Sequence, residues 1–133
     1  MELTYAPGAC NIGPDEIARR RRVAIIGFIA TLALGAVLLL VGTPAGDATR
    51  LLVALPLTGA AIGWIQAQRR FCMAYGLAGT FNLGKIGEMS RVSDLASLAA
   101  DRRTSMIIAA QGFAIGVGGA ALFCLLPVAL PRI

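Results

Sequence analysis

Long apolar runs separated by short polar segments set the pattern of this chain. Residues 23–41 (VAIIGFIATLALGAVLLLV) contain nineteen residues without a charged side chain. As a helix rising 1.5 Å per residue they would extend about 28 Å, close to the roughly 30 Å hydrocarbon thickness of a bilayer. Residues 51–67 and 106–126 form two more uncharged apolar runs. The pattern predicts an all-α integral membrane protein with three transmembrane helices.

The segments around these runs carry signals for helix ends and turns. Pro14 suits the first position of a helix, with Asn11 or Gly13 as a cap, so the first helix is expected to begin well before residue 23. Residues 42–50 (GTPAGDATR) are rich in glycine and proline and predict a turn. Residues 71–84 are apolar but broken by glycines, and are expected to continue the second helix and then lie at the membrane interface.

A different periodicity marks residues 85–103. Ile86, Met89, Val92 and Leu95 recur every three residues, with charged residues at the positions between them. This spacing is typical of an amphipathic helix. We expect such a helix on the cytoplasmic membrane surface or against the protein's own helix bundle.

Composition supports a membrane protein of one domain, residues 1–133. Of its residues 57% are hydrophobic and 14% are charged, and the mean hydropathy is +0.76. A soluble domain usually has about 25% charged residues. The net charge of +5 comes from basic residues that flank the apolar runs, which favours contact with anionic lipid head groups and argues against nucleic acid.

The distribution of basic residues predicts the orientation. Three spans put the N-terminal tail and the segment between the second and third spans on one side, with ten Lys and Arg. The other side has two, Arg50 and Arg132. The positive-inside rule places the N-terminus in the cytoplasm and the C-terminus outside.

Few residues in the predicted spans could carry chemistry. None of the three spans contains an ionisable Asp, Glu, Lys, Arg or His, which usually mark ion or proton paths. The chain has no histidine and no CxxC pair, so we expect no metal site, no cofactor and no enzymatic activity. The remaining polar residues either bond between helices or line a transport path in an oligomer: Thr31, Thr58, Gln66 and Gln111.

Glycines at helical spacing predict close packing of the spans. Gly59 and Gly63 form one GxxxG motif, and Gly112 and Gly116 form another. Such pairs let helix backbones approach closely, either within the three-helix unit or between copies.

The cysteines are the sharper candidates for a functional site. Cys10 and Cys72 both fall on the predicted cytoplasmic side, where thiols stay reduced. Arg69 and Arg70 precede Cys72, and their charge would favour its thiolate, whereas apolar neighbours would oppose it. Either a structural or a reactive thiol fits this pattern.

Short motifs in residues 11–80 resemble those of the small bacterial inner-membrane hairpin that accompanies membrane rhodaneses. The matching positions are Asn11, Gly13, Leu57, Thr58, Gly59, Cys72, Tyr75 and Gly76. The resemblance implies a membrane hairpin in the bacterial inner membrane and a link to sulfur species or anions. Met73 departs from the family, which usually has proline there, and residues 84–133 have no counterpart in it.

These observations favour a non-catalytic accessory or structural subunit, in a larger membrane assembly or a homo-oligomer. An oligomeric small transporter or channel is one alternative. Handling of thiols or sulfur species at the cytoplasmic face is the other.

Overall fold

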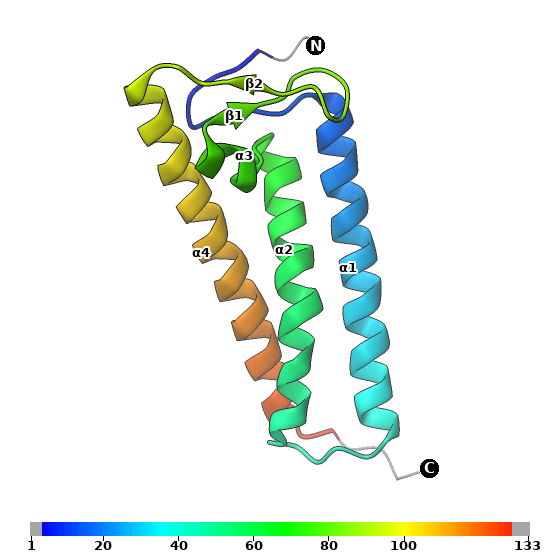
Figure 1. The fold of residues 1–133 in the computed structure, drawn as a ribbon. Helices are drawn as coiled ribbons and strands as arrows, with labels where there is room; N and C mark the ends of the chain where they lie inside the picture. Colours follow the sequence, from blue (N-terminus) through cyan, green and yellow to red (C-terminus); the bar gives the residue numbers. More distant parts are fainter. Residues whose placement is uncertain (1–3, 129–133) are drawn as a thin grey trace.

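The computed structural model describes residues 4–128 and is built around three long helices (Figure 1). Helix α1 spans Pro14–Leu40, helix α2 spans Ala54–Arg69 and helix α4 spans Leu95–Leu125. A short 3-10 helix, η1 (Ala48–Val53), leads directly into α2. By length and composition, α1, the η1–α2 unit and α4 are each able to cross a membrane, which confirms the three predicted helices.

The beginning of α1 confirms the predicted start. Gly13 is the N-cap and Pro14 is the first helical residue. Asp15 and Glu16 lie in the first turn, where acidic side chains favour the positive end of the helix dipole. The helix therefore begins nine residues before the apolar run and carries the arginines 19–22 on its first turns.

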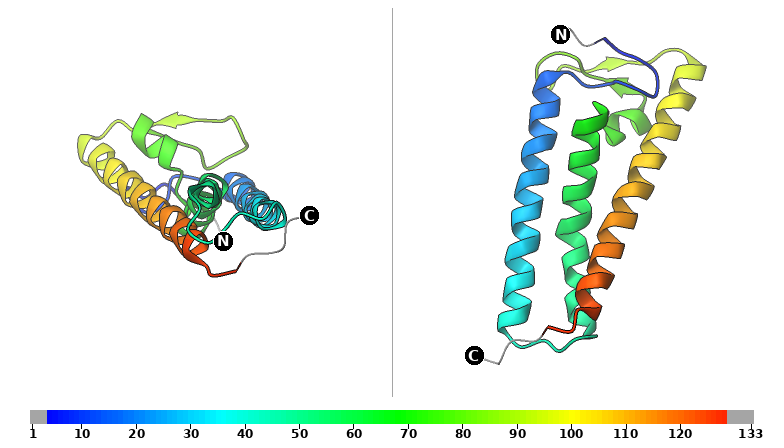
Figure 2. Two further views of the ribbon diagram at one scale, coloured as in Figure 1. Left: turned by 90° about the horizontal axis from the view of Figure 1, so that it is seen from below. Right: turned by 180° about the vertical axis from the view of Figure 1, so that it is seen from behind.

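Helix α2 lies between α1 and α4 and contacts both of them (Figure 2). Small residues make these contacts close: a Cβ added to Gly27 of α1 would lie only 2.8 Å from Cβ of Ala60 on α2. On the α4 side, Gly112 lies against Ile62 and Gly116 lies against Thr58. The three helices form a layer with α2 at its centre, held by close approach of backbones instead of large interlocking side chains.

The four glycines of the two GxxxG motifs differ in whether another helix packs against them. Gly63, Gly112 and Gly116 all pack against neighbouring helices of the same chain. Gly59 differs, because no atom lies within 4 Å of a Cβ built on it. The GxxxG motif of α2 thus contributes one residue to the contact with α1 and leaves the other on the surface.

Residues 85–103 do not form the predicted separate amphipathic helix. Residues 85–94 are turns and a strand, β2 (Ser90–Arg91), and only Leu95 onward is helical, as the first part of α4. Gly87 adopts a φ of +96°, which a helix does not permit, and the Asp94 side chain accepts a hydrogen bond from the Ser97 amide. The helix therefore starts at this cap and continues without a break into the third apolar run.

The predicted continuation of α2 past residue 70 is also wrong. Arg70 has a φ of +54° and a left-handed conformation that ends α2. A short helix, α3 (Met73–Ala78), and a strand, β1 (Thr80–Phe81), follow. Strand β1 pairs antiparallel with β2, with Thr80 opposite Arg91 and Phe81 opposite Ser90.

These short elements and the N-terminal segment cover one end of the layer (Figures 1 and 2). We call this region the polar cap; it consists of residues 4–13 and 70–94 and the first turns of α1 and α4. Ile12 and Asn82 form a parallel bridge between the N-terminal segment and the residues after β1. The polar cap is thus assembled from segments far apart in the sequence.

Arg50 fastens the opposite end of the layer. It is fully buried, and its guanidinium donates to the carbonyl oxygens of Thr43, Phe123, Leu126 and Val128 at 2.5–3.3 Å. These include carbonyls at the C-terminal end of α4, which attract a cation. The residue that the sequence suggested only as a flanking charge is therefore a helix cap. Arg132 lies outside the described residues.

Candidate functional site

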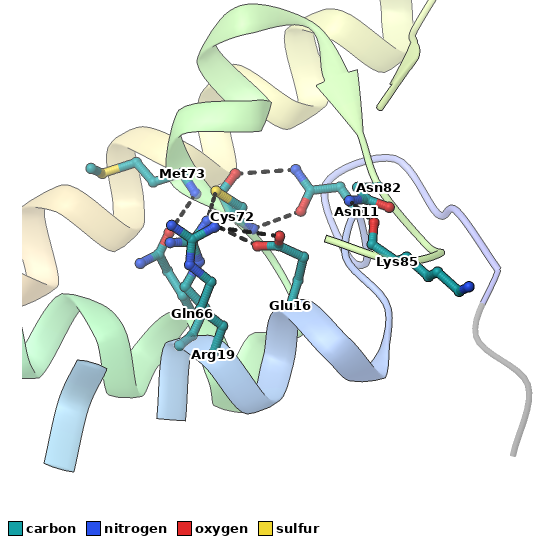
Figure 3. Close-up of polar contacts among 9 residues, drawn as sticks. Asn11, Glu16, Arg19, Gln66, Cys72, Met73, Asn82 and Lys85 are labelled. Carbon is teal, nitrogen blue, oxygen red and sulfur yellow. Dashed lines mark hydrogen bonds and ion pairs between the residues drawn. The ribbon is translucent and has the colours of Figure 1, made fainter. Parts of the chain in front are cut away.

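The polar cap contains the predicted candidate residues Cys10, Cys72 and Arg70, and Arg69 directly precedes it as the last residue of α2 (Figure 3 shows the surroundings of Cys72). Cys72 follows the left-handed turn at Arg70 and is the N-cap of α3. Its exposed fraction is 1%. The position is therefore fixed by the turn between two helices, and the thiol is enclosed by the protein.

Asn11 holds the backbone on both sides of Cys72 (Figure 3). Its amide nitrogen donates to the Cys72 carbonyl at 3.1 Å, and its amide oxygen accepts from the Cys72 amide at 2.6 Å. The Asn11 backbone amide also donates to the Arg70 carbonyl at 3.1 Å. Asn11 is itself fully buried, so these bonds lie out of contact with water. The N-terminal segment is clamped onto the turn after α2.

A charged pair on α1, with Glu16 fully buried and Arg20 partly buried, faces the thiol. Arg20 Nη2 lies 2.9 Å from Cys72 Sγ and 3.3 Å from Glu16 Oε2. The Glu16 side chain is fully buried and also pairs with Arg19 at 3.7 Å. The Arg20 guanidinium is therefore shared between the thiol and the Glu16 carboxylate. The cation that contacts Cys72 is thus Arg20. The sequence suggested Arg69 and Arg70 instead.

The predicted neighbours Arg69 and Arg70 point to other contacts. Arg69 Nη2 donates to Gln111 Oε1 on α4 at 3.2 Å. The Arg70 side chain lines a groove between α1 and α2. The spacing of residues along the sequence could not show that Arg20 is the cation beside Cys72, because the two residues are 52 positions apart.

Tyr75 and Gln66 complete the surroundings of the thiol. Burial raises the pKa of the Tyr75 hydroxyl, and the nearby negative charge of Glu16 raises it further. Gln66 Oε1 accepts from the Met73 amide at 2.8 Å, which holds the start of α3. Tyr75 therefore stays neutral at physiological pH.

Cys10 occupies a separate place in the polar cap. It is buried, and its thiol donates to the Ile12 carbonyl at 3.6 Å. Cys10, Cys72 and Cys124 are all free thiols. The thiol of Cys124, at the opposite end, donates to the Asp47 carbonyl at 3.4 Å. The geometry gives all three cysteines a place in the packing, and the exposure that a reactive Cys72 requires is missing.

The N-terminal segment is also bonded to α4, which sequence reasoning missed. The Tyr5 hydroxyl donates to Asp101 Oδ2 at 2.6 Å, and the Gly8 amide donates to Asp101 Oδ1 at 2.7 Å. Thr104 Oγ1 in turn donates to the Gly8 carbonyl at 2.7 Å. Asp101 is fully buried, so its carboxylate depends on these donors. The only signal in the sequence was that Asp101 is an acidic residue directly before two arginines, 102 and 103.

Two grooves on the surface of residues 4–128 bear on function. The first, about 370 Å³, lies over α2 between α1 and α4, and its walls include Gly35, Ala36, Leu57 and Phe123. We call it the apolar groove. The second, about 470 Å³, lies between the start of α1 and the end of α2. We call it the basic groove; its lining is Pro14, Ile17, Ala18, Arg21, Ala67, Gln68 and Arg70.

The polar residues of the spans do not meet at one place. Thr58 lies against Gly116, Gln66 bonds to the Met73 amide and Gln111 bonds to Arg69. Across residues 4–128, no group of three or more His, Cys, Asp or Glu converges in a way that could hold a metal ion. The described part of the chain offers helix packing, two grooves and a clamped thiol.

No protein-family model, curated protein or solved structure matches the chain. The likeness to the rhodanese-associated hairpin therefore rests on the sequence motifs alone.

Proposed function

We propose that this chain is a non-catalytic accessory subunit of the bacterial inner membrane, which binds the transmembrane helix of another subunit in its apolar groove. Its three helices span the bilayer, and the polar cap lies in the cytoplasm. The observation that carries the proposal is the apolar groove itself, which a layer of only three helices leaves open over α2.

The groove has the form and chemistry that a helix needs. Its walls come from α1, η1, α2 and α4, and the small residues Gly35, Ala36 and Gly119 leave room between them. Ridges of side chains on one helix pack into such grooves, and small residues permit a close approach in membranes. In addition, only 11% of the most apolar stretch of α1 is buried within the chain. Most of this helix is thus available to lipid or to a partner.

Charge favours a different protein over a second copy as the occupant. The cap end carries ten basic side chains against five acidic ones among residues 4–128, an excess of five positive charges. Two copies side by side in the same orientation would bring these like charges together. A partner with an acidic cytoplasmic face would be attracted instead. The same excess supports a cytoplasmic cap by the positive-inside rule.

Photocrosslinking in native membranes tests the proposal. A photoreactive amino acid at Leu32, which lines the apolar groove, should crosslink to one discrete protein with an acidic cytoplasmic face. The same residue at Ile26, which is 67% exposed on α1 outside the groove, should not give that product. Crosslinks from Leu32 to lipid alone, or to a second copy of the chain, would overturn the proposal.

Filling the apolar groove with a larger side chain is a second test of the proposal. Ala36→Phe should reduce co-purification of the crosslinked partner at least about ten-fold. A lost hydrophobic contact and a steric clash together should cost more than about 1.4 kcal/mol of binding free energy, which corresponds to a ten-fold change in affinity. Ala33→Phe, at an exposed position of α1 outside the groove, is the matched control and should leave co-purification intact. Equal effects of the two variants would argue against the groove as the contact.

A further inference from the structure

The basic groove has two cations that the protein itself leaves unpaired. Within residues 4–128, the side chains of Arg21 and Arg70 form no ion pair and donate no hydrogen bond. The buried carboxylate of Glu16, on the same helix as Arg21, is already paired with Arg19 and Arg20. The positive charge in the groove is therefore available to an anion from outside.

Both arginines are held in place by backbone structure. Pro14, Ile17, Ala18 and Arg21 recur at the spacing of one helix face, and that face of α1 looks toward the end of α2. Arg70 is fixed by the hydrogen bond from the Asn11 amide to its carbonyl. The same Asn11 clamp that encloses Cys72 thus fixes the backbone from which the Arg70 side chain enters the groove.

The groove lies at the edge of the membrane. Arg21 is two helical residues before the apolar run that starts at residue 23, a rise of about 3 Å. Arg70 follows three residues after the run that ends at Ala67. The head-group layers extend about 5–8 Å beyond the hydrocarbon core on each side, so both guanidiniums reach the depth of the lipid phosphates.

We infer that the basic groove binds the phosphate of an anionic lipid head group, with Arg21 and Arg70 as its cationic ligands. Guanidinium groups bond phosphate oxygens in pairs, and Gln68 adds an uncharged donor on the same wall. Pro14, Ile17, Ala18 and Ala67 line the rest of the groove with apolar side chains. The inference rests on the membrane placement given under the proposed function and adds a defined lipid site to it.

The test measures lipid retained by the purified full-length protein in a neutral detergent. Phosphatidylglycerol is added at physiological salt, and bound lipid is counted by native mass spectrometry. We expect it to bind at least about ten-fold more tightly to the unaltered chain than to Arg21→Gln/Arg70→Gln, because each arginine near a lipid surface contributes roughly a five-fold factor. Zwitterionic phosphatidylcholine should bind weakly to both.

Arg102→Gln/Arg103→Gln is the matched control. It removes the same charge from exposed positions on α4, outside the groove, and should change binding less than about two-fold, because distant charges are screened beyond about 8 Å. An equal loss of phosphatidylglycerol binding in the two double variants would mean that the lipid is attracted by the overall positive charge, and would overturn the proposed site. Each single variant, Arg21→Gln and Arg70→Gln, is measured with a thermal unfolding curve, so that a folding defect is separated from lost binding.

Inorganic phosphate distinguishes the source of the anion. Added alone, it should compete for the groove only weakly, since it lacks the anchoring of a lipid in the membrane. Competition as strong as that of phosphatidylglycerol would overturn the assignment to a lipid. This experiment is independent of the crosslink from Leu32, so failure of the lipid site leaves the partner proposal standing, and the reverse also holds.

Discussion

Asn11 shows how one side chain can organise the polar cap. The nitrogen and the oxygen of its side-chain amide both form hydrogen bonds with the backbone of Cys72, which is 61 residues away, and all of these groups are buried. The sequence directed attention to Cys72 but not to Asn11 or Arg20 as its partners. Contacts between residues so far apart in the chain leave no trace in local spacing, so the thiol could be predicted and its environment could not.

The clamp predicts how Cys72 reacts. In a chain with Cys10→Ala and Cys124→Ala, Cys72 should react with a thiol reagent much more slowly than a cysteine placed at exposed Ser93. Asn11→Ala should destabilise the fold by about 2–4 kcal/mol, because it leaves a buried amide and carbonyl unpaired, and should speed the labelling of Cys72. Labelling rate against pH and thermal unfolding provide the measurements.

The contrary result is also informative. If Cys72 reacts as fast as the cysteine at position 93, the enclosed position is wrong and a reactive thiol regains support. If Asn11→Ala leaves both labelling and stability unchanged, the clamp does not hold the turn.

At the scale of elements, the apolar runs were a dependable signal and the periodicity of residues 85–103 was not. All three runs coincide with the long helices α1, η1–α2 and α4, and the first and third end at the C-cap, one residue past the helix. The periodicity in residues 85–103 suggested one helix, but Gly87 and the cap at Asp94 divide that segment. Asp94 followed by Ser97 is a readable capping signal, and giving it more weight than the periodicity would have placed the start of α4 correctly.

The contact between α2 and α4 can be tested with two glycines of one helix. A Cβ at Gly116 would clash with Thr58, whereas a Cβ at Gly118 would meet no atom within 4 Å. Gly116→Ala should therefore destabilise the protein by about 1–3 kcal/mol through overpacking. Gly118→Ala should be neutral or slightly stabilising, since alanine favours helices by up to about 1 kcal/mol over glycine. Thermal unfolding in detergent compares them, and equal curves would contradict the observed α2–α4 contact.

Arg50 makes the second prediction at this scale. Arg50→Met removes a buried guanidinium that satisfies carbonyls of two chain segments, and should lower the free energy of unfolding by about 3 kcal/mol or more. Arg50→Lys should rescue only part of this loss, because a single ammonium cannot reach the same set of oxygens. Arg91→Met, at an exposed position, is the control and should have little effect on thermal unfolding. A tolerated Arg50→Met would show that the cap of α4 is formed by other groups.

At the scale of the whole molecule, the count of helices and the grouping of charges were predictable, and the polar cap was not. The two basic segments that the sequence assigned to one side do lie at one end of the layer (Figure 1). Two long helices, α1 and η1–α2, separate these segments, so the chain returns to the end at which it started. The cap depends on bonds between Tyr5, Asp101 and Thr104 and between Ile12 and Asn82, which form only after the helices bring these segments together.

Orientation in the membrane is the prediction that follows from the whole molecule. Ten basic residues at the cap end and Arg50 at the opposite end of the described chain should retain the cap in the cytoplasm, since Lys and Arg resist translocation. A phosphatase reporter, active only outside the cytoplasm, should be active when fused after residue 49 or 128 and inactive after residue 93. A fluorescent protein that folds only in the cytoplasm should give the opposite pattern at the same three sites. A cytoplasmic signal after residue 128 would mean that α4 does not cross the bilayer, and would contradict the three-span arrangement on which the groove and the lipid site both depend.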